Sequence, residues 1–331
     1  MSDIKRNRSV LATIATVFVL GYGLHYLGYF LRVRYFNWLD TLQLDEGLAH
    51  SLGYLGHVIF LIIMVIYALM VKQDRKYVFS FCRGPALRNL KYAVIGAVTG
   101  FAMMGICIGA AAMNGDLVIG FAPNANYGLF AIAALCVFVQ ASVEEIEGRG
   151  FVFGKMNAEG VPTLVAVLVS SFYFSYLHST NPGFGLLPLI SLLIIGIFYA
   201  LSYYYFGTLW FAMTAHMMWN FTQDFIFGLP DSGKPAVDSI LSTTVNSSSF
   251  FYDKTFGIEG SKMALIVNGL ACLVVFLIGV ILMSDTPDTQ PIKTSDPEAA
   301  AIKTVTPHID AVKVDTPATD PPEPAAPEEE N

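Results

Sequence analysis

The chain has 331 residues, of which 54% are hydrophobic and only 14% carry a charge. Together with a mean hydropathy of +0.56, this composition excludes an ordinary soluble protein and indicates a polytopic membrane protein. The net charge of −7 comes from residues 285–331, where 11 acidic residues stand against 3 lysines. The rest of the chain is nearly neutral and gives no indication of a nucleic-acid partner.

Eight apolar runs follow one another along the chain. About 20 residues are needed to cross a bilayer as a helix, and most of the runs reach that length. They predict an all-α fold, a polytopic bundle of about eight transmembrane helices within residues 1–284. The runs span residues 9–31, 52–71, 92–113, 127–147, 162–179, 185–204, 207–228 and 263–283.

Basic residues predict how this bundle is oriented. Lys5, Arg6 and Arg8 precede the first run, and residues 72–91 after the second run carry six Lys and Arg. Cytoplasmic segments of membrane proteins are enriched in these two residues. Because the number of spans is even, we expect an integral protein of the cell membrane with both termini in the cytoplasm.

Two segments outside the runs have a different composition. Residues 229–262 are rich in Pro, Ser and Thr, and we interpret them as an external loop that folds over the bundle. Residues 285–331 contain nine prolines among acidic residues, Thr and Ala. Such a segment buries too little apolar surface to repay the entropy of ordering. It predicts a second region, a disordered acidic cytoplasmic tail.

The fourth run ends in a cluster of charges that lipid would not tolerate. A charged side chain at the centre of a membrane helix costs about 2.5–3.5 kcal/mol on insertion scales, so such residues face protein or trapped water. Glu145 and Arg149 are four residues apart and can pair across one helical turn. Glu144 points about 100° away from Glu145. We therefore expect a neutralised structural pair beside one free carboxylate.

Two further polar motifs lie in the fifth and seventh runs. Phe174 and His178 are four residues apart, and so are His216 and Asn220. Each motif alone is weak, because a lone histidine in a helix is usually a hydrogen-bonded core residue. His25 and His57 in the first two runs receive that interpretation.

Taken together, these motifs resemble the CPBP family of intramembrane proteases, which includes CaaX prenyl endopeptidases and bacteriocin-processing or immunity (Abi) proteins. The family is marked by EExxxR, FxxxH and HxxxN, and all seven positions match in order within residues 144–220. Two departures from the pattern are Glu147 and Gly148, where the family usually has apolar residues. For Glu147 two places are open, one beside Glu144 as a repelling like charge and one in water at the cytoplasmic rim.

The resemblance implies a hydrolase that cleaves a peptide bond with an activated water. Glu144 is then the general base, His178 holds the same water, His216 orients it or binds a metal, and Asn220 donates to the oxyanion. Glu145, Arg149 and Phe174 support the site. A divalent ion, Zn²⁺, held by His178, His216 and Glu144 is one way to activate the water. Activation by glutamate alone is the other.

Three functions stay in competition. The first is the metalloendopeptidase, with a peptide or protein substrate of the prenylated CaaX type at the bilayer. The second is a non-catalytic CPBP-like scaffold or bacteriocin self-immunity protein, and the third is a carboxylate-dependent ion or proton transporter.

One geometric question is open for the enzyme, since straight helices would keep Glu144 and His178 apart. Either the fourth helix continues through residues 151–154, or the fifth is tilted or preceded by a re-entrant segment.

Overall fold

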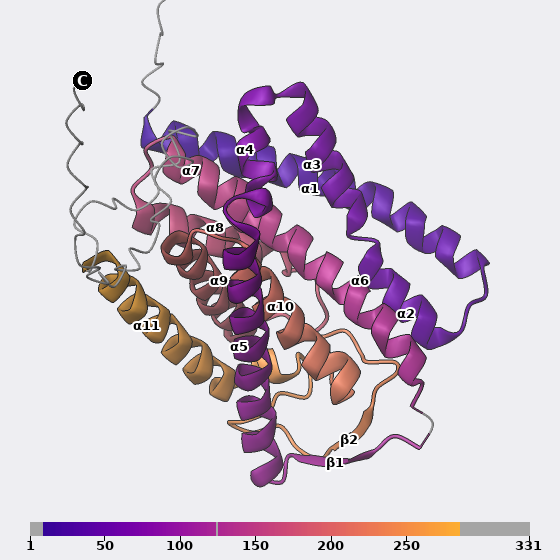
Figure 1. Ribbon diagram of the computed structural model, residues 1–331. Coiled ribbons are helices and arrows are strands. Elements are labelled where there is room, and N and C mark those ends of the chain that lie inside the picture. Colours follow the sequence, from indigo (N-terminus) through magenta and orange to yellow (C-terminus); the bar gives the residue numbers. More distant parts are fainter. Residues whose placement is uncertain (1–8, 124, 285–331) are drawn as a thin grey trace, which may run out of the picture. The chain divides into compact units, whose positions relative to one another are not determined.

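Helices form almost all of the regular structure in the computed structural model of the protein, which describes residues 9–123 and 125–284. The predicted tail, residues 285–331, lies outside the described residues. The described residues belong to one unit, and the all-α prediction is confirmed (Figure 1). The long helices are α1 (Val10–Thr41), α2 (Glu46–Leu55), α3 (Val58–Met70), α5 (Ala86–Met113), α6 (Tyr127–Glu145), α8 (Thr163–Leu177), α9 (Leu186–Phe206), α10 (Trp210–Phe221) and α11 (Lys262–Ser284).

Short elements connect these helices. They are the 3₁₀ turns η1 (Lys72–Asp74), η2 (Ser80–Cys82) and η5 (Ile258–Gly260), the helices α4 (Arg75–Val78) and α7 (Gly154–Ala158), and the π-helical segments η3 (Ile146–Phe153) and η4 (Thr222–Ile226). The two described strands, β1 (Leu117–Phe121) and β2 (Leu241–Val245), pair antiparallel with Leu117 opposite Val245. They lie at one end of the bundle, while α4 and α7 lie at the other (Figure 1).

All eight predicted runs are helical, but not all of them reach the length of a membrane span. Among the described residues, six helices are long and apolar enough to cross a bilayer: 10–41, 46–70, 86–113, 127–158, 186–206 and 262–284. The fifth run forms α8, of 15 residues, and the seventh forms α10, of 12 residues. The count of eight spans is therefore approximate, and the helices fit an integral membrane protein.

The fourth helix continues well beyond the predicted end of its run. After α6 the chain stays helical through η3 and α7 as far as Ala158. Of the two alternatives for bringing the motifs together, the structure thus shows the first. Glu144 lies inside a continuous helix, and π-helical turns of this kind are frequent at functional sites.

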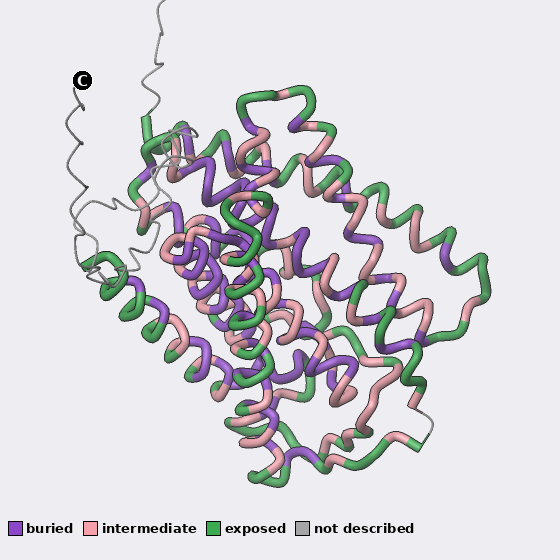
Figure 2. The backbone as a smooth tube through the Cα atoms, viewed as in Figure 1, coloured by how far each residue is buried: buried purple, intermediate pink, exposed green. Residues whose placement is uncertain are grey.

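Inner and outer helices differ in how much of their surface the protein covers. The apolar window of the helix at 127–158 is 61% buried, whereas those of α1 and α11 are 17% and 22% buried. Figure 2 shows the same contrast, with exposed backbone concentrated on α1, α5 and α11. The outer helices present their apolar side chains outward, as lipid requires, and the polar motifs lie on the inner ones.

Helix α10 packs against α5 and α6, and small residues on α5 allow a close approach. A Cβ atom at Gly100 would lie 2.1 Å from the carbonyl oxygen of Ala215, and one at Gly96 would lie 2.3 Å from that of Phe211. Two glycines spaced by four residues are typical of tight helix contacts in membranes. This contact fixes the position of α10, which carries the HxxxN motif.

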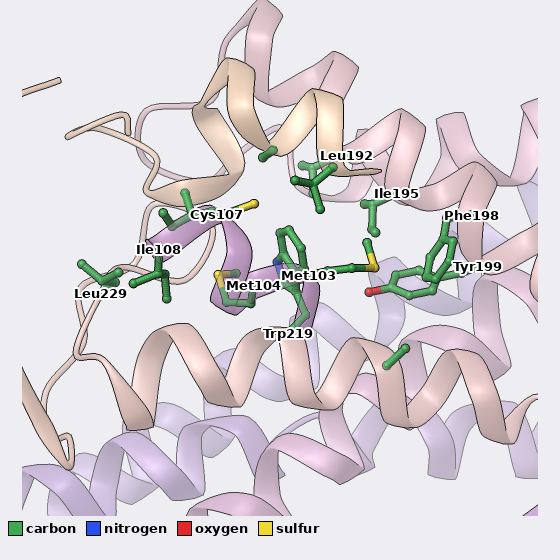
Figure 3. Packing of buried hydrophobic residues seen from close by; sticks show 14 of the residues in the cluster. Met103, Met104, Cys107, Ile108, Leu192, Ile195, Phe198, Tyr199, Trp219 and Leu229 are labelled. Carbon is green, nitrogen blue, oxygen red and sulfur yellow. The ribbon is translucent and has the colours of Figure 1, made fainter. Parts of the chain in front are cut away.

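A buried apolar cluster joins α5, α9, α10 and α11. Figure 3 shows part of it, including Met103, Ile195 and Trp219. Tyr252, Phe256 and Ile258 from the segment before α11 belong to the same cluster, so this segment folds over the bundle as predicted.

Candidate functional site

The two adjacent glutamates of α6 have different surroundings. Glu145 is fully buried, and Arg149 Nη1 donates to its Oε1 at 3.0 Å, so the predicted pair is confirmed. The same oxygen lies 2.9 Å from His216 Nδ1. Arg149 Nη2 also donates to the carbonyl oxygen of Gly196 at 3.1 Å. This network ties α6, η3, α9 and α10 together and holds the ring of His216.

Glu144 faces a cavity instead. Its Oε1 accepts a hydrogen bond from Gln140 Nε2 at 2.7 Å, and His57 Nε2 lies 3.4 Å from the same oxygen. Its Oε2 has no hydrogen-bond partner among the described residues, and His216 Nε2 lies 3.8 Å from it. One carboxylate oxygen is therefore free to accept a proton.

Three imidazoles line the cavity together with this carboxylate, and in each of them Nδ1 has an oxygen as its hydrogen-bond partner. Each Nδ1 lies 2.9 Å from an oxygen: the carbonyl of Tyr54 for His57, the carbonyl of Phe174 for His178, and Oε1 of Glu145 for His216. A carbonyl oxygen only accepts, so Nδ1 carries the proton in His57 and His178. In the neutral ring, Nε2 then keeps a lone pair for a water or a metal.

Phe174 fixes the relative positions of the motif residues. Its ring centroid lies 4.8 Å from that of His178 and 5.7 Å from that of His216. The guanidinium of Arg149 lies over the same ring, 4.5 Å from its centroid. The phenylalanine of FxxxH thus packs against the other two motifs, which accounts for an aromatic residue at this position.

Asn220 reaches Glu144 through one intermediate side chain. Its Nδ2 donates to Gln140 Oε1 at 3.2 Å, and Gln140 in turn donates to Glu144. Asn220 and Glu144 line the same cavity. Because an amide nitrogen has two hydrogens, one remains for a bound group.

The cavity at Glu144 has a volume of about 300 Å³, and Glu144, His57, His178, His216 and Asn220 all line it. A second cavity of about 280 Å³ adjoins it. Six residues line both: Arg32, His57, Glu144, Phe174, His178 and Lys234. The structure thus brings every predicted catalytic residue to one cavity inside the bundle.

The sequence interpretation missed part of this site. His57 is hydrogen-bonded, as expected of a core histidine, but it also contacts Glu144. Nothing in the sequence marks it, because it lies at the break between α2 and α3, outside the motifs. Gln140 lies one helical turn before Glu144, and that spacing is the signal that could have found it.

Of the two places considered for Glu147, the structure rules out water at the cytoplasmic rim. Its side chain is buried, Tyr173 donates its hydroxyl hydrogen to Oε1, and His25 Nδ1 lies 3.1 Å from the same oxygen. It is therefore held by His25 and Tyr173, lines the second cavity together with Glu144, and does not lie in water at the rim.

The donor set at Glu144 agrees in kind with a metal site, since Zn²⁺ takes imidazole nitrogens and carboxylate oxygens. The hydrogen bond from His216 Nδ1 to a carboxylate is also the arrangement that orients metal-bound histidines. Within residues 9–123 and 125–284, however, no group of three His, Cys, Asp or Glu side chains lies close enough together to hold an ion.

Comparison with known proteins adds one finding. Residues 125–222 match the family model of the Rce1-like type II CAAX prenyl endopeptidases, and this stretch contains all seven motif residues. Neither the comparison with curated proteins nor the one with solved structures found a match. The family match confirms the resemblance to CPBP proteins: over residues 125–222 the chain is similar to type II CAAX prenyl endopeptidases of the Rce1-like kind.

Proposed function

We propose that this protein is an intramembrane endopeptidase in which Glu144 activates the attacking water. The observation that carries this proposal is that Glu144, whose Oε2 has no hydrogen-bond partner among the described residues, lines one cavity together with His57, His178 and His216. Glu145 also has an oxygen without a hydrogen-bond partner, but it does not line the cavity. Of these two glutamates, Glu144 alone combines an unpaired oxygen with a side chain that lines the cavity.

In the proposed reaction, Glu144 takes a proton from the water, and the water oxygen attacks the peptide carbonyl carbon. The electron pair of the C=O bond moves to its oxygen, and the free N–H of Asn220 stabilises that oxyanion. The tetrahedral intermediate then collapses, the C–N bond breaks, and Glu144 returns its proton to the leaving amine. His178 and His57 hold the water through Nε2.

His216 has a positioning role in this scheme. Its Nδ1 contacts Glu145, and its ring is stacked on Tyr199 with centroids 5.2 Å apart. These contacts aim Nε2 at the water between it and Glu144. His178, His216 and Glu144 are the residues that would hold a Zn²⁺ ion, and its chemistry there would be to make the water more acidic. The proton transfers above require only the residues of this chain.

The substrates we propose are peptides presented at the bilayer, with prenylated CaaX-type peptides first because of the family match. Apolar side chains of the cavity wall, such as Leu192, Ile195 and Trp219, support a substrate with an apolar segment. A place in the cell membrane with both termini in the cytoplasm belongs to the same proposal, and the Lys/Arg distribution supports this orientation.

A scaffold function accounts for the network of Glu145 and Arg149 but leaves the free oxygen of Glu144 unexplained.

The direct test is cleavage of a labelled prenylated peptide by purified protein, with the products identified by mass. We expect a single cut. Cleavage in the presence of a chelator, together with the zinc content of His178→Ala and His216→Ala, tests whether a metal ion takes part. Loss of cleavage and of zinc on chelation would support the ion, and unchanged turnover would support glutamate alone. Absence of cleavage by folded protein would contradict the proposal.

A further inference from the structure

The cavity at Glu144 extends to the surface of the protein. Among the described residues that line it, the exposed ones are Lys234, Pro235 and Val237, which lie together between η4 and β2. Its other lining residues are buried or half-buried. The cavity therefore runs from Glu144, inside the bundle, to the surface at this short segment.

The adjoining cavity extends to the surface at the same place. Its exposed lining residues are Thr180 and Pro182 in the loop between α8 and α9, Tyr29 of α1, and again Lys234. The two loops are in contact, because a Cβ atom at Gly233 would lie 1.9 Å from the carbonyl oxygen of Pro182. We call these loops, residues 178–185 and 227–240, the mouth loops.

The mouth loops belong to the end of the bundle that carries the two strands. The second loop leads directly into β2, and Ala122, which follows β1, donates its backbone N–H to the carbonyl oxygen of Ile240 at 3.3 Å. A Cβ atom at Gly47, in the first turn of α2, would lie 3.0 Å from the carboxylate of Asp238. Figure 1 shows α4 and α7 at the opposite end. No described residue from that end, within 71–91 or 150–163, lines either cavity.

The end opposite the mouth loops is basic and closed. Residues 72–91 contain six Lys and Arg, and the one acidic residue among them, Asp74, is paired with Lys155 at 2.6 Å. This excess of positive charge predicts the cytoplasmic side. Beyond Gly148 the fourth helix enters a packed apolar cluster at this end. Phe151, Phe153 and Tyr77 belong to it and are 0%, 2% and 4% exposed. A peptide coming from this side would have to displace these rings to reach Glu144.

We propose that the catalytic cavities open to the exterior through the mouth loops, and that the substrates are peptides exposed on that side of the membrane. Such peptides are segments of chains that have crossed the bilayer. The inference rests on the proposed endopeptidase function and adds to it the side from which the substrate comes. Prenylated peptides are then substrates only where they reach this side.

The first test uses sealed membrane vesicles of known orientation and a labelled peptide whose charged fluorophore keeps it from crossing the bilayer. Right-side-out vesicles should cleave the peptide at the rate that they show after detergent is added. Inside-out vesicles should cleave it only after detergent opens them. A dye trapped inside the vesicles establishes that they are sealed. Cleavage by sealed inside-out vesicles at the detergent rate would overturn the inference.

The second test labels single cysteines in intact cells with a bulky maleimide that does not cross membranes. Val237→Cys in a Cys82→Ser background should react from outside, and its labelling should stop cleavage. Thr244→Cys is the matched control, because Thr244 is exposed on the neighbouring β2 but lines neither cavity. It should react equally and keep its activity. The native Cys82, exposed at the basic end, should react only after the cells are permeabilised.

A binding measurement separates this inference from the proposed function. Glu144→Gln protein in right-side-out vesicles should bind the fluorescent peptide, and the same protein in sealed inside-out vesicles should not, even if no form of the protein cleaves it. Binding by the inside-out vesicles alone would overturn the inference. So would labelling of Val237→Cys only after permeabilisation, or unchanged cleavage by fully labelled Val237→Cys. Size exclusion of each variant in detergent establishes that it is folded.

Discussion

Replacing Arg149 with methionine tests whether the buried network holds the site together. Arg149 and Glu145 are both 0% exposed. Removing one partner of a buried pair costs about 3–5 kcal/mol, because the other charge loses its compensation. The hydrogen bond to the carbonyl of Gly196 on α9 is lost as well, which places the cost toward the upper end. At roughly 2–4 °C per kcal/mol for a chain of this size, we expect Tm to fall by about 6–20 °C.

The assay is thermal unfolding in detergent, followed by intrinsic fluorescence. Glu159→Gln is the control, because Glu159 pairs with Lys155 at 2.8 Å with the same spacing but is 32% exposed. Its loss should cost no more than about 0.5 kcal/mol. Combining Arg149→Met with Glu145→Gln removes both charges and should recover much of the stability. An unchanged Tm in the single Arg149 variant would refute the reasoning, since it would mean that water already solvates the pair.

Three further predictions concern the fold. Burial raises the pKa of Glu259 to about 7. Because the folded protein then keeps a proton on this carboxyl that the unfolded chain has lost, the free energy of unfolding should fall as pH rises from about 4.5 toward 7. Glu259→Gln should abolish this dependence of Tm on pH. A Cβ at Gly100 would meet a carbonyl of α10, whereas one at Gly105 would meet nothing within 4 Å. Gly100→Ala should therefore reduce the yield of folded protein by size exclusion, with Gly105→Ala as the neutral control; equal yields would contradict the close helix contact. Finally, reporters fused after Lys76 and near Ser247 should signal cytoplasm and exterior respectively, and the reverse result would refute the orientation.

The sequence was sufficient to predict the relations between side chains that are neighbours on one helix. The pairing of Glu145 with Arg149 follows from a spacing of four on one helix, and the free state of Glu144 follows from the angle between neighbours. It left open whether the fourth helix continues past its apolar run, because a π-helical turn such as η3 has no simple compositional signal. It also did not predict His57, which reaches Glu144 only through the packing of α2 and α3 against α6.

The same distinction applies to the cations of the cavity. In the sequence alone, Arg32 is a charged residue that flanks the end of the first apolar run, and Lys234 is an ordinary loop residue. Each becomes informative only when tertiary packing places it beside Glu144. The position of Arg32 at the cavity and the turn that carries Lys234 depend on contacts between segments far apart in the chain, which helical periodicity does not encode.

The most direct test of the central claim is turnover of a peptide by Glu144→Gln compared with Glu147→Gln. Both substitutions remove one carboxylate from the same continuous helix, but Glu147 contacts His25 and Tyr173, whereas Glu144 lies within 4 Å of His57 and His216. General base catalysis contributes about 10²- to 10⁴-fold, so Glu144→Gln should lose that factor while Glu147→Gln retains most of its activity. The losses in His178→Ala and His216→Ala should not add to that of Glu144→Gln, because all act on one water. Turnover by folded Glu144→Gln at the wild-type rate would contradict the account.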